Sequence, residues 1–187
     1  KAEPHVGFQR LLEWGKAKKH GYFVFTSNVD GQFQKAGFDP KLLAECHGSI
    51  HHFQCISDCS AEIWSAEGIQ VSIDPVTYTA TEELPHCRYC RRLARPNILM
   101  FGDGAWNPGL TDRQDKALDA WLEKNDGCKI VAIECGAGRA IPSVRHFCER
   151  RGQRLIRINP REPKVRPGHL SLPCGALEAL QGIAEAL

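Results

Sequence analysis

The stretch that decides the fold is Gly21-Tyr22-Phe23-Val24-Phe25, which runs into the polar segment Thr26-Ser27-Asn28-Val29-Asp30-Gly31. A short aromatic and β-branched run of this kind is typical of a buried strand. Polar residues directly after such a run are what an α/β sheet presents at the carboxyl ends of its strands. We therefore expect residues 26–31 to lie at a functional edge of a parallel sheet.

A second segment, residues 42–46, repeats this pattern and leads into the polar cluster Glu45-Cys46-His47-Gly48-Ser49. Asn28, Asp30 and His47 would then meet as an amide, a carboxylate and an imidazole that titrates near neutral pH. Such a set suits a polar substrate. The alternative interpretation is an Asx turn at residues 28–31 with a hydrogen-bonded core histidine.

Four cysteines form two close pairs, Cys55-x3-Cys59 and Cys87-x2-Cys90, separated by a 27-residue gap. Two close pairs of thiolates are what a tetrahedral structural zinc site needs, and four protein ligands leave no position open for catalysis. The alternative is four free thiols. His51 and His52 could substitute as ligands, although a position beside the site or on the surface is favoured.

The segment Gly136-Ala137-Gly138 lies between a predicted strand and a predicted helix, where backbone N–H groups and the helix dipole favour anions. As a dinucleotide fingerprint it is incomplete, because the third glycine position holds Ile141 and the next strand ends in Asn159 instead of an acid. The alternative is a glycine turn packed for space.

Hydrophobic periodicity and turn residues place the remaining elements. We expect a helix with Pro4 at its first position, a capping box of Thr111 and Gln114 ahead of a helix to about residue 125, and a small hairpin of residues 69–73 and 76–80. Further strands are predicted at residues 98–101, 129–134 and 155–159, helices at 142–151 and 177–187, and a loop at 160–173. The later strands and helix form a βαβ unit with a right-handed crossover.

These motifs together resemble those of the sirtuins, the NAD-dependent protein deacylases, over nearly the whole chain. Thr26 to Gly31 is similar to their Thr-Gln-Asn-Ile-Asp-Gly motif, and residues 46–49 resemble Leu-His-Gly-Ser. Residues 95–103 are similar to Arg-Pro-x-Val-Val-x-Phe-Gly-Glu, and Ile158-Asn159 to the Ile-Asn pair that ends a later strand. Ser27 departs from the family's glutamine, and residues 135–138 lack the hydroxyls of its Gly-Thr-Ser loop.

The resemblance implies a deacylase that transfers an acyl group from lysine to the ADP-ribose of NAD and releases nicotinamide. His47 would act as general base and Asn28 would position ribose or water. The implied cofactor-binding residues are Thr26, Ser27, Asn28, Val29, Asp30, His47, Gly136, Ala137, Gly138, Asn159, Gly175 and Ala176. Phe101-Gly102-Asp103 would present a strand edge to the acyl-lysine peptide, the alternative being a buried strand that ends in a turn.

The expected fold is therefore a doubly wound, parallel, Rossmann-like sheet of residues 1–54 and 91–187, with a zinc module inserted at residues 55–90. Sirtuins begin with a strand, a Gly-Ala-Gly-Ile-Ser loop and a flexible segment, so we expect the functional polypeptide to extend upstream of Lys1. Two alternatives remain open: hydrolysis of NAD or transfer of ADP-ribose on the same scaffold, and a non-catalytic domain that binds NAD or ADP-ribose.

Composition excludes few function classes. The 187 residues are 42% hydrophobic and 25% charged, with a formal net charge of +2. The charge is too balanced to indicate affinity for nucleic acid or for an anionic membrane, so neither partner is implied. The nine cysteines are an odd number, which favours reduced thiols and one metal site over a disulfide framework. We expect a cytoplasmic protein, with a nuclear location left open.

Overall fold

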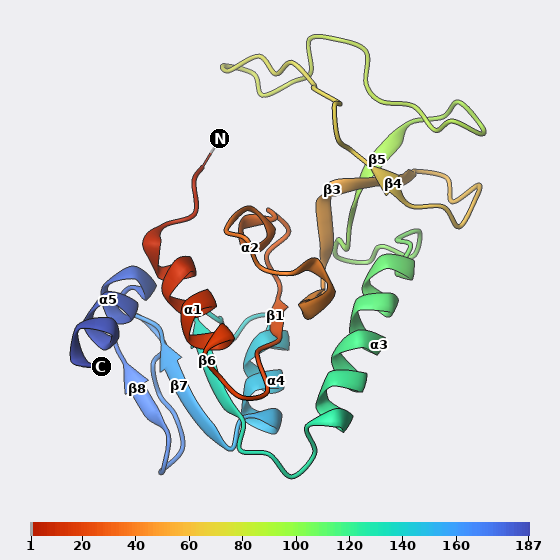
Figure 1. Cartoon of the computed structure of the whole chain (residues 1–187). Helices are drawn as coiled ribbons and strands as arrows, with labels where there is room; N and C mark the ends of the chain where they lie inside the picture. Colours follow the sequence, from red (N-terminus) through yellow and green to blue (C-terminus); the bar gives the residue numbers. More distant parts are fainter. Residues whose placement is uncertain (1) are drawn as a thin grey trace.

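The computed structural model describes residues 2–187 and contains two parallel sheets (Figure 1). In the first, β1 (Val24–Thr26) pairs with β2 (Leu43–Glu45); in the second, the order is β6 (Val131–Cys135), β7 (Arg154–Ile158) and β8 (Leu170–Leu172). All these pairs are parallel, as the α/β prediction requires. Strand β8 lies in the segment predicted as a loop. The prediction missed it because three residues are too few to show an alternating pattern, and only their pairing with β7 defines the strand.

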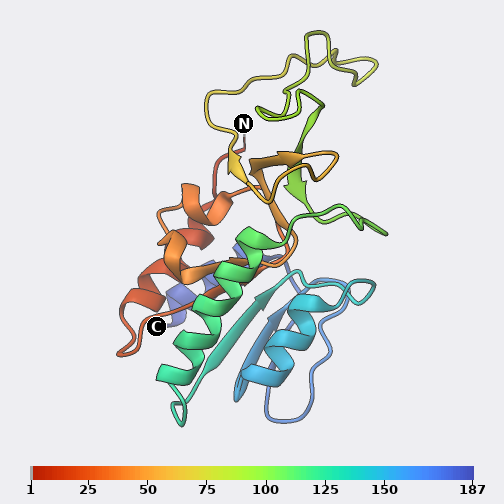
Figure 2. The same cartoon turned by 90° about the vertical axis from the view of Figure 1, so that its right-hand side faces the viewer.

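Residues 2–187 also form five α-helices and one 3₁₀ helix. They are α1 (Val6–Lys16), α2 (Gln32–Lys35), the 3₁₀ helix η1 (Pro40–Leu42), α3 (Gly109–Lys124), α4 (Ser143–Arg151) and α5 (Ala176–Ala186). Figures 1 and 2 place α1 beside α5 on one side of the strands, and α3 and α4 on the other. Helices on both faces of parallel strands are the doubly wound arrangement predicted from the sequence.

Two small clusters of buried side chains hold these layers together. Leu12, Ala36 and Phe38 form one beneath α1, and Ile158, Ala179 and Leu180 form the other between β7 and α5. Leu11 of α1 packs against both clusters. Helix α1 therefore joins the first sheet to the second.

A cavity of about 630 Å³ separates β1 from β6. Its walls are largely apolar and consist of residues of both strands and of α1, α3, α4 and α5. Among these residues, Phe25 of β1 stacks on Phe147 of α4, with ring centroids 4.3 Å apart. Within residues 2–187, β1 pairs only with β2 and β6 only with β7. Each of the two strands therefore keeps one backbone edge free toward this cavity.

A third sheet is antiparallel, with the order β4 (Trp64–Ser65), β3 (Gly48–Cys55) and β5 (Ala94–Ile98). The prediction of a strand at residues 98–101 in the parallel sheet is therefore wrong. The strand β5 ends at Ile98, and it pairs with β3 in the antiparallel sheet. The reason is Asp103, whose carboxylate accepts hydrogen bonds from Arg95 at 3.0 and 2.5 Å and so folds residues 99–103 back as a turn.

The predicted hairpin at residues 69–80 is reduced to one antiparallel bridge between Ile73 and Ala80. The carboxylate of Asp74 accepts the N–H groups of Val76 and Thr77 at 2.8 and 2.7 Å. These side-chain hydrogen bonds tighten the turn where the second strand was expected. Residues 66–93 project away from the α/β body (Figure 1).

Two predicted helix starts are also wrong. Helix α1 is capped by His5, whose Nδ1 accepts the N–H of Gly7 at 3.0 Å, so Pro4 precedes the cap. Helix α3 begins at Gly109, which places Thr111 and Gln114 inside it. Their side chains contact β2 instead of capping the helix, a role that no local pattern reveals.

Candidate active site and metal centre

The two polar segments predicted to meet do so at the carboxyl ends of β1 and β2. Thr26 pairs with Glu45 in the parallel register, and the N–H of Cys46 donates to the carbonyl of Thr26 at 2.9 Å. The N–H of Ile50 donates to the carbonyl of Val29, also at 2.9 Å. The loop at residues 26–31 and the turn at residues 46–49 are thus held side by side by backbone hydrogen bonds.

His47 lies in a tight turn between β2 and β3. Gly48 has a φ of +78°, and a Cβ there would lie 2.0 Å from the carbonyl oxygen of Asn97, so the turn requires glycine. The N–H of Leu99 donates to the carbonyl of His47 at 3.0 Å. His47 is half-buried, and its imidazole takes part in none of the hydrogen bonds found within residues 2–187. Its ring nitrogens are therefore available to a ligand.

The neighbouring thiol of Cys46 stays neutral. Burial, together with the nearby Asp115, raises the pKa of Cys46 to about 11. The residue beside His47 is therefore not a competing base near neutral pH.

Asn28 and Asp30 differ in whether their side chains form hydrogen bonds within the loop. Thr26 Oγ1 accepts the N–H of Asn28 at 3.1 Å, and the Asn28 side chain is exposed. Asp30 Oδ1 accepts the N–H of Gln32 at 3.2 Å, so the local turn predicted as an alternative forms at Asp30. His51 Nε2 lies 3.0 Å from the Asp30 carbonyl oxygen and braces the loop. Among the hydrogen bonds found within residues 2–187, none involves the side-chain amide of Asn28.

A buried polar network holds β2, and no local pattern in the sequence predicts it. Glu45 is 2% exposed, and its carboxylate accepts hydrogen bonds from Gln34 at 3.0 Å and Gln114 at 3.1 Å. Thr111 Oγ1 donates to the carbonyl of Glu45 at 3.0 Å. The network fixes the strand that ends beside His47.

Seven of the twelve predicted cofactor-binding residues line the large cavity. Thr26, Ser27 and Asn28 line it at one end, and Gly136, Ala137, Gly138 and Ala176 line it elsewhere. Gly136 has a φ of +70°, and a Cβ on Gly136 or Gly138 would have no atom within 4 Å. The predicted residues that lie outside its wall are Val29, Asp30, His47, Asn159 and Gly175.

Asn159 is buried and mostly engaged with the protein. Its Oδ1 accepts the N–H groups of Arg161 and Glu162 at 3.0 and 2.9 Å, and its Nδ2 donates to the carbonyl of Ala137 at 3.1 Å. One amide hydrogen remains. Most of the hydrogen bonds of the Asn159 side chain therefore hold the loops at residues 137 and 161–162. Contact between Asn159 and the adenosine ribose of NAD stays a prediction.

The predicted peptide-binding residues form a turn. Phe101 is 89% exposed, and the N–H of Asp103 donates to the carbonyl of Met100 at 3.2 Å. The hydrogen bond from Arg95 lowers the pKa of Asp103. Gln54 anchors the following residues by donating to the carbonyl of Ala105 at 2.7 Å. The turn therefore exposes the apolar side chain of Phe101, while hydrogen bonds hold Asp103 and Ala105 in place.

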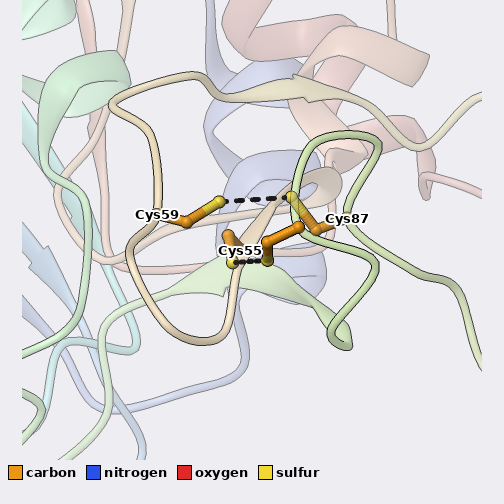
Figure 3. A group of neighbouring side chains, drawn as sticks. Cys55, Cys59 and Cys87 are labelled. Carbon is orange, nitrogen blue, oxygen red and sulfur yellow. Dashed lines mark hydrogen bonds between the residues drawn. The ribbon is translucent and has the colours of Figure 1, made fainter.

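The four predicted metal ligands converge. The sulfur atoms of Cys55, Cys59, Cys87 and Cys90 all lie within 4.8 Å of one another. Figure 3 shows Cys55, Cys59 and Cys87 pointing toward one another, and Cys55 Sγ lies 3.5 Å from Cys90 Sγ. Within residues 2–187 the group of candidate ligands contains no histidine, so His51 and His52 are not part of it.

The cysteine cluster fits zinc chemically. The N–H of Ser57 donates to Cys55 Sγ at 3.4 Å, and that of Tyr89 to Cys87 Sγ at 3.5 Å. The N–H of Cys59, with that of Ser57, lowers the pKa of Cys55 to about 6. Hydrogen bonds to Cys90 and Cys55 raise the pKa of Cys59 to about 12. Zinc binds the thiolate form and would displace such protons, so these four residues fit a closed structural site.

Comparison with known proteins identifies the family. A model of the Sir2 family matches residues 1–123. The chain belongs to the Sir2 family. Solved Sir2 structures share its fold: a mutant Sir2 homologue in complex with ADP-ribose has a TM-score of 0.68 at 24% identity, covering 100% of this chain and 67% of that one. A Sir2 homologue in complex with NAD has a TM-score of 0.66 at 24% identity, covering 100% and 65%. The predicted Rossmann-like fold is confirmed.

Curated relatives match most of the chain. An NAD-dependent protein deacylase of Pyrococcus furiosus is 32% identical over 165 residues, which is 87% of this chain and 58% of the relative. One from Thermococcus kodakarensis is 27% identical over 172 residues, 89% of this chain and 60% of the relative. The chain thus spans about three fifths of the length of these relatives.

None of the helices within residues 2–187 is long and apolar enough to span a bilayer.

Proposed function

We propose that this Sir2-family chain carries out NAD-dependent deacylation of protein lysines. The reactants would be acyl-lysine, NAD and water, and the products lysine, nicotinamide and O-acyl-ADP-ribose. The observation that supports this most is the pair of backbone hydrogen bonds, Cys46 to Thr26 and Ile50 to Val29, which places the Asn28 loop against the His47 turn. The Asn28 loop also lines the cavity that reaches Gly136.

In this proposal, NAD supplies the ribose that receives the acyl group. The imidazole of His47, with no hydrogen bond found to it within residues 2–187, would accept a proton from a ribose hydroxyl. The exposed amide of Asn28 would orient ribose or water, and Asp30 would hold the nicotinamide carboxamide through the carboxylate oxygen that Gln32 does not use.

The remaining predicted residues divide between cofactor and peptide. The backbone at Gly136 to Gly138, with the open space where side chains would stand, would approach the adenosine half of NAD. Gly175 and Ala176 would border the adenine. The exposed tip at Phe101 and Gly102, fixed through Asp103, would contact the acyl-lysine peptide.

The zinc module and the location complete the proposal. The four-cysteine site would be structural, because all four positions of a tetrahedral ion are filled by protein. We also propose a cytoplasmic location, supported by the nine cysteines, none of which forms a disulfide within residues 2–187.

A second candidate function is transfer of ADP-ribose to a protein, or to water. One relative, named a probable bifunctional ADP-ribose hydrolase/ADP-ribosyltransferase of Fusarium oxysporum, is 25% identical over 146 residues, 73% of this chain and 24% of the relative. Ser27, where sirtuins have glutamine, shortens a hydrogen-bonding arm in the cavity wall. Both features bear on which nucleophile meets the ribose.

A product assay separates these functions. The protein would be incubated with NAD and an acetyl-lysine peptide, and the products identified by mass spectrometry. O-acetyl-ADP-ribose supports deacylation, a mass increase of the protein supports ADP-ribosyl transfer, and free ADP-ribose without peptide deacetylation supports hydrolysis. NAD binding with no product would support a binding domain.

The matched variants are His47→Ala and, as control, His20→Ala, since His20 is an exposed histidine ahead of β1. Loss of a positioned base should lower the deacylation rate by roughly 100-fold or more while NAD affinity measured by calorimetry changes little. Unchanged turnover in His47→Ala would contradict the assignment of the base.

A further inference from the structure

The segment at residues 139–166 carries a local charge that the net charge of the whole chain does not show. It contains eight arginines and one lysine but only two carboxylates, Glu149 and Glu162, so its formal net charge is +7. Because the whole chain has a formal net charge of +2, the remaining residues together carry −5. A local excess of one sign attracts a partner of the opposite sign even where the average charge is balanced.

The structure folds this segment into a groove of about 460 Å³, which lies between α4 and the connection from β7 to β8 and which we call the α4 groove. Figure 2 shows this connection running beside α4. The buried Arg157 joins the two walls: its Nη2 lies 2.8 Å from Oε1 of Glu149 in α4, and its Nη1 donates to the carbonyl of Lys164 at 2.7 Å. Hydrogen bonds within the protein therefore hold both walls in place.

The two carboxylates of the segment already have arginine partners. Glu149 pairs with Arg157, and that hydrogen bond lowers the pKa of Glu149. Glu162 has a carboxylate oxygen 3.6 Å from Nη2 of Arg145. Arg145 and Arg157 are both buried, so these ion pairs leave the exposed cations of the groove without a neutralising carboxylate.

Four exposed cations surround the α4 groove. Their side chains take part in no hydrogen bond or ion pair found within residues 2–187; they are Arg139, Arg161, Lys164 and Arg166. The first three line the groove, and Arg166 contributes, after Arg157, to the lowered pKa of Glu149 in its wall. Arg139 precedes α4, whereas the other three belong to the opposite wall, so positive charge faces the groove from both sides.

A nucleic-acid backbone fits this groove better than a protein or a membrane surface does. Protein interfaces have an apolar centre, yet among residues 139–166 the only exposed large hydrophobic side chain is Ile141. A bilayer surface is flat and would not reach cations on both walls of a groove. A nucleic-acid strand is a chain of single charges, and contacts with its phosphates need no apolar surface.

We propose that the α4 groove binds nucleic acid through its phosphate backbone. The contacting cations would be Arg139, Arg161, Lys164 and Arg166. The segment has one large aromatic side chain, Phe147, which is half-buried and stacked on Phe25, so it is not free to stack on a base. Binding would therefore be independent of base sequence and strongly dependent on salt. No residue of the groove lines the large cavity, so this binding is separate from the proposed deacylation.

Fluorescence anisotropy with labelled DNA on the 187-residue protein tests the proposal. The probes are a single strand of mixed sequence and a duplex of the same length, each titrated at several potassium chloride concentrations. The logarithm of the association constant should fall linearly with the logarithm of the salt concentration, with a slope of about −3 to −4 for four phosphate contacts. Binding of either probe with this slope supports the proposal, and the tighter probe identifies the preferred form.

Two outcomes with these and related probes would overturn the proposal. The first is the absence of binding of either DNA at low salt. The second is binding of poly-glutamate, or of vesicles that contain phosphatidylserine, at least as tightly as DNA, because the groove would then not be selective for a nucleic-acid backbone.

The variants Arg161→Gln and Lys164→Gln each remove one phosphate contact and should make the slope shallower by about 0.7–0.9. The fold should persist in both, because neither side chain makes a hydrogen bond or ion pair found within residues 2–187, and circular dichroism checks this. Lys19→Gln removes the same charge as Lys164→Gln from the exposed loop between α1 and β1, and it is the control. A slope that stays unchanged in Lys164→Gln, or that changes equally in Lys19→Gln, would overturn the assignment of the groove.

Discussion

Replacing Arg157 with methionine should destabilise this protein severely. Arg157 is 1% exposed, and it donates from Nε to Glu134 Oε1 at 2.6 Å and from Nη2 to Glu134 Oε2 at 2.9 Å. It also donates to Glu149 at 2.8 Å and to the carbonyl of Lys164 at 2.7 Å. Methionine would leave the carboxylate of Glu134, itself 1% exposed, buried without a counter-charge.

Removing one partner of a buried ion pair costs about 3–5 kcal/mol. For a chain of this size 1 kcal/mol lowers the melting temperature by about 2–4 °C, so Arg157→Met should melt about 6–20 °C lower. The double variant Arg157→Met/Glu134→Leu buries no charge and should recover most of that loss, because well-packed apolar groups often replace a buried pair without cost.

The assay is thermal and urea unfolding followed by circular dichroism, with zinc present throughout. Arg154→Met is the control: it lies on the same strand, is exposed, and makes one hydrogen bond to the carbonyl of Gly168 at 2.8 Å, so its loss should cost about 1 kcal/mol or less. The reasoning would be refuted by a single variant as stable as the wild type, or by a double variant as unstable as the single one.

Three further outcomes follow from the site. Cys87→Ala should lose bound zinc by elemental analysis and unfold at lower urea, since metal binding energy is also folding energy, whereas Cys128→Ala should change neither. Gly48 has a φ of +78°, and the methyl group of an alanine there would lie 2.0 Å from a carbonyl oxygen of β5. Gly48→Ala should therefore lower the free energy of unfolding by more than about 1 kcal/mol and also lower activity. A stable, active variant would contradict the turn geometry. Arg95 lowers the pKa of Asp103, so the Asp103 carboxylate stabilises the fold at pH values above its ordinary pKa of 3.8, and this contribution is lost as the pH falls through the lowered pKa. The difference in unfolding free energy between wild type and Asp103→Asn should therefore close below about pH 4. A difference that stays constant with pH would count against the ion pair.

Local sequence was enough to predict the parallel strands β1, β2, β6 and β7 and the cluster of cysteines, but not the short strand β8. Of the aromatic and β-branched run before Thr26, Val24 and Phe25 form the start of β1, and the polar residues that follow lie at the carboxyl end of that strand. Two close cysteine pairs specify a tetrahedral site because the ligand spacing itself carries the geometry.

Tertiary contacts decided the rest. Thr111 and Gln114 carry a helix-capping pattern, yet their partner is Glu45, more than 60 residues away, because a buried carboxylate needs donors wherever they come from. The arginine at position 95 turns residues 99–103 away from the sheet for the same kind of reason. Periodicity and spacing determine which elements form, whereas the pairing of buried charges and polar groups across distant segments depends on the folded arrangement.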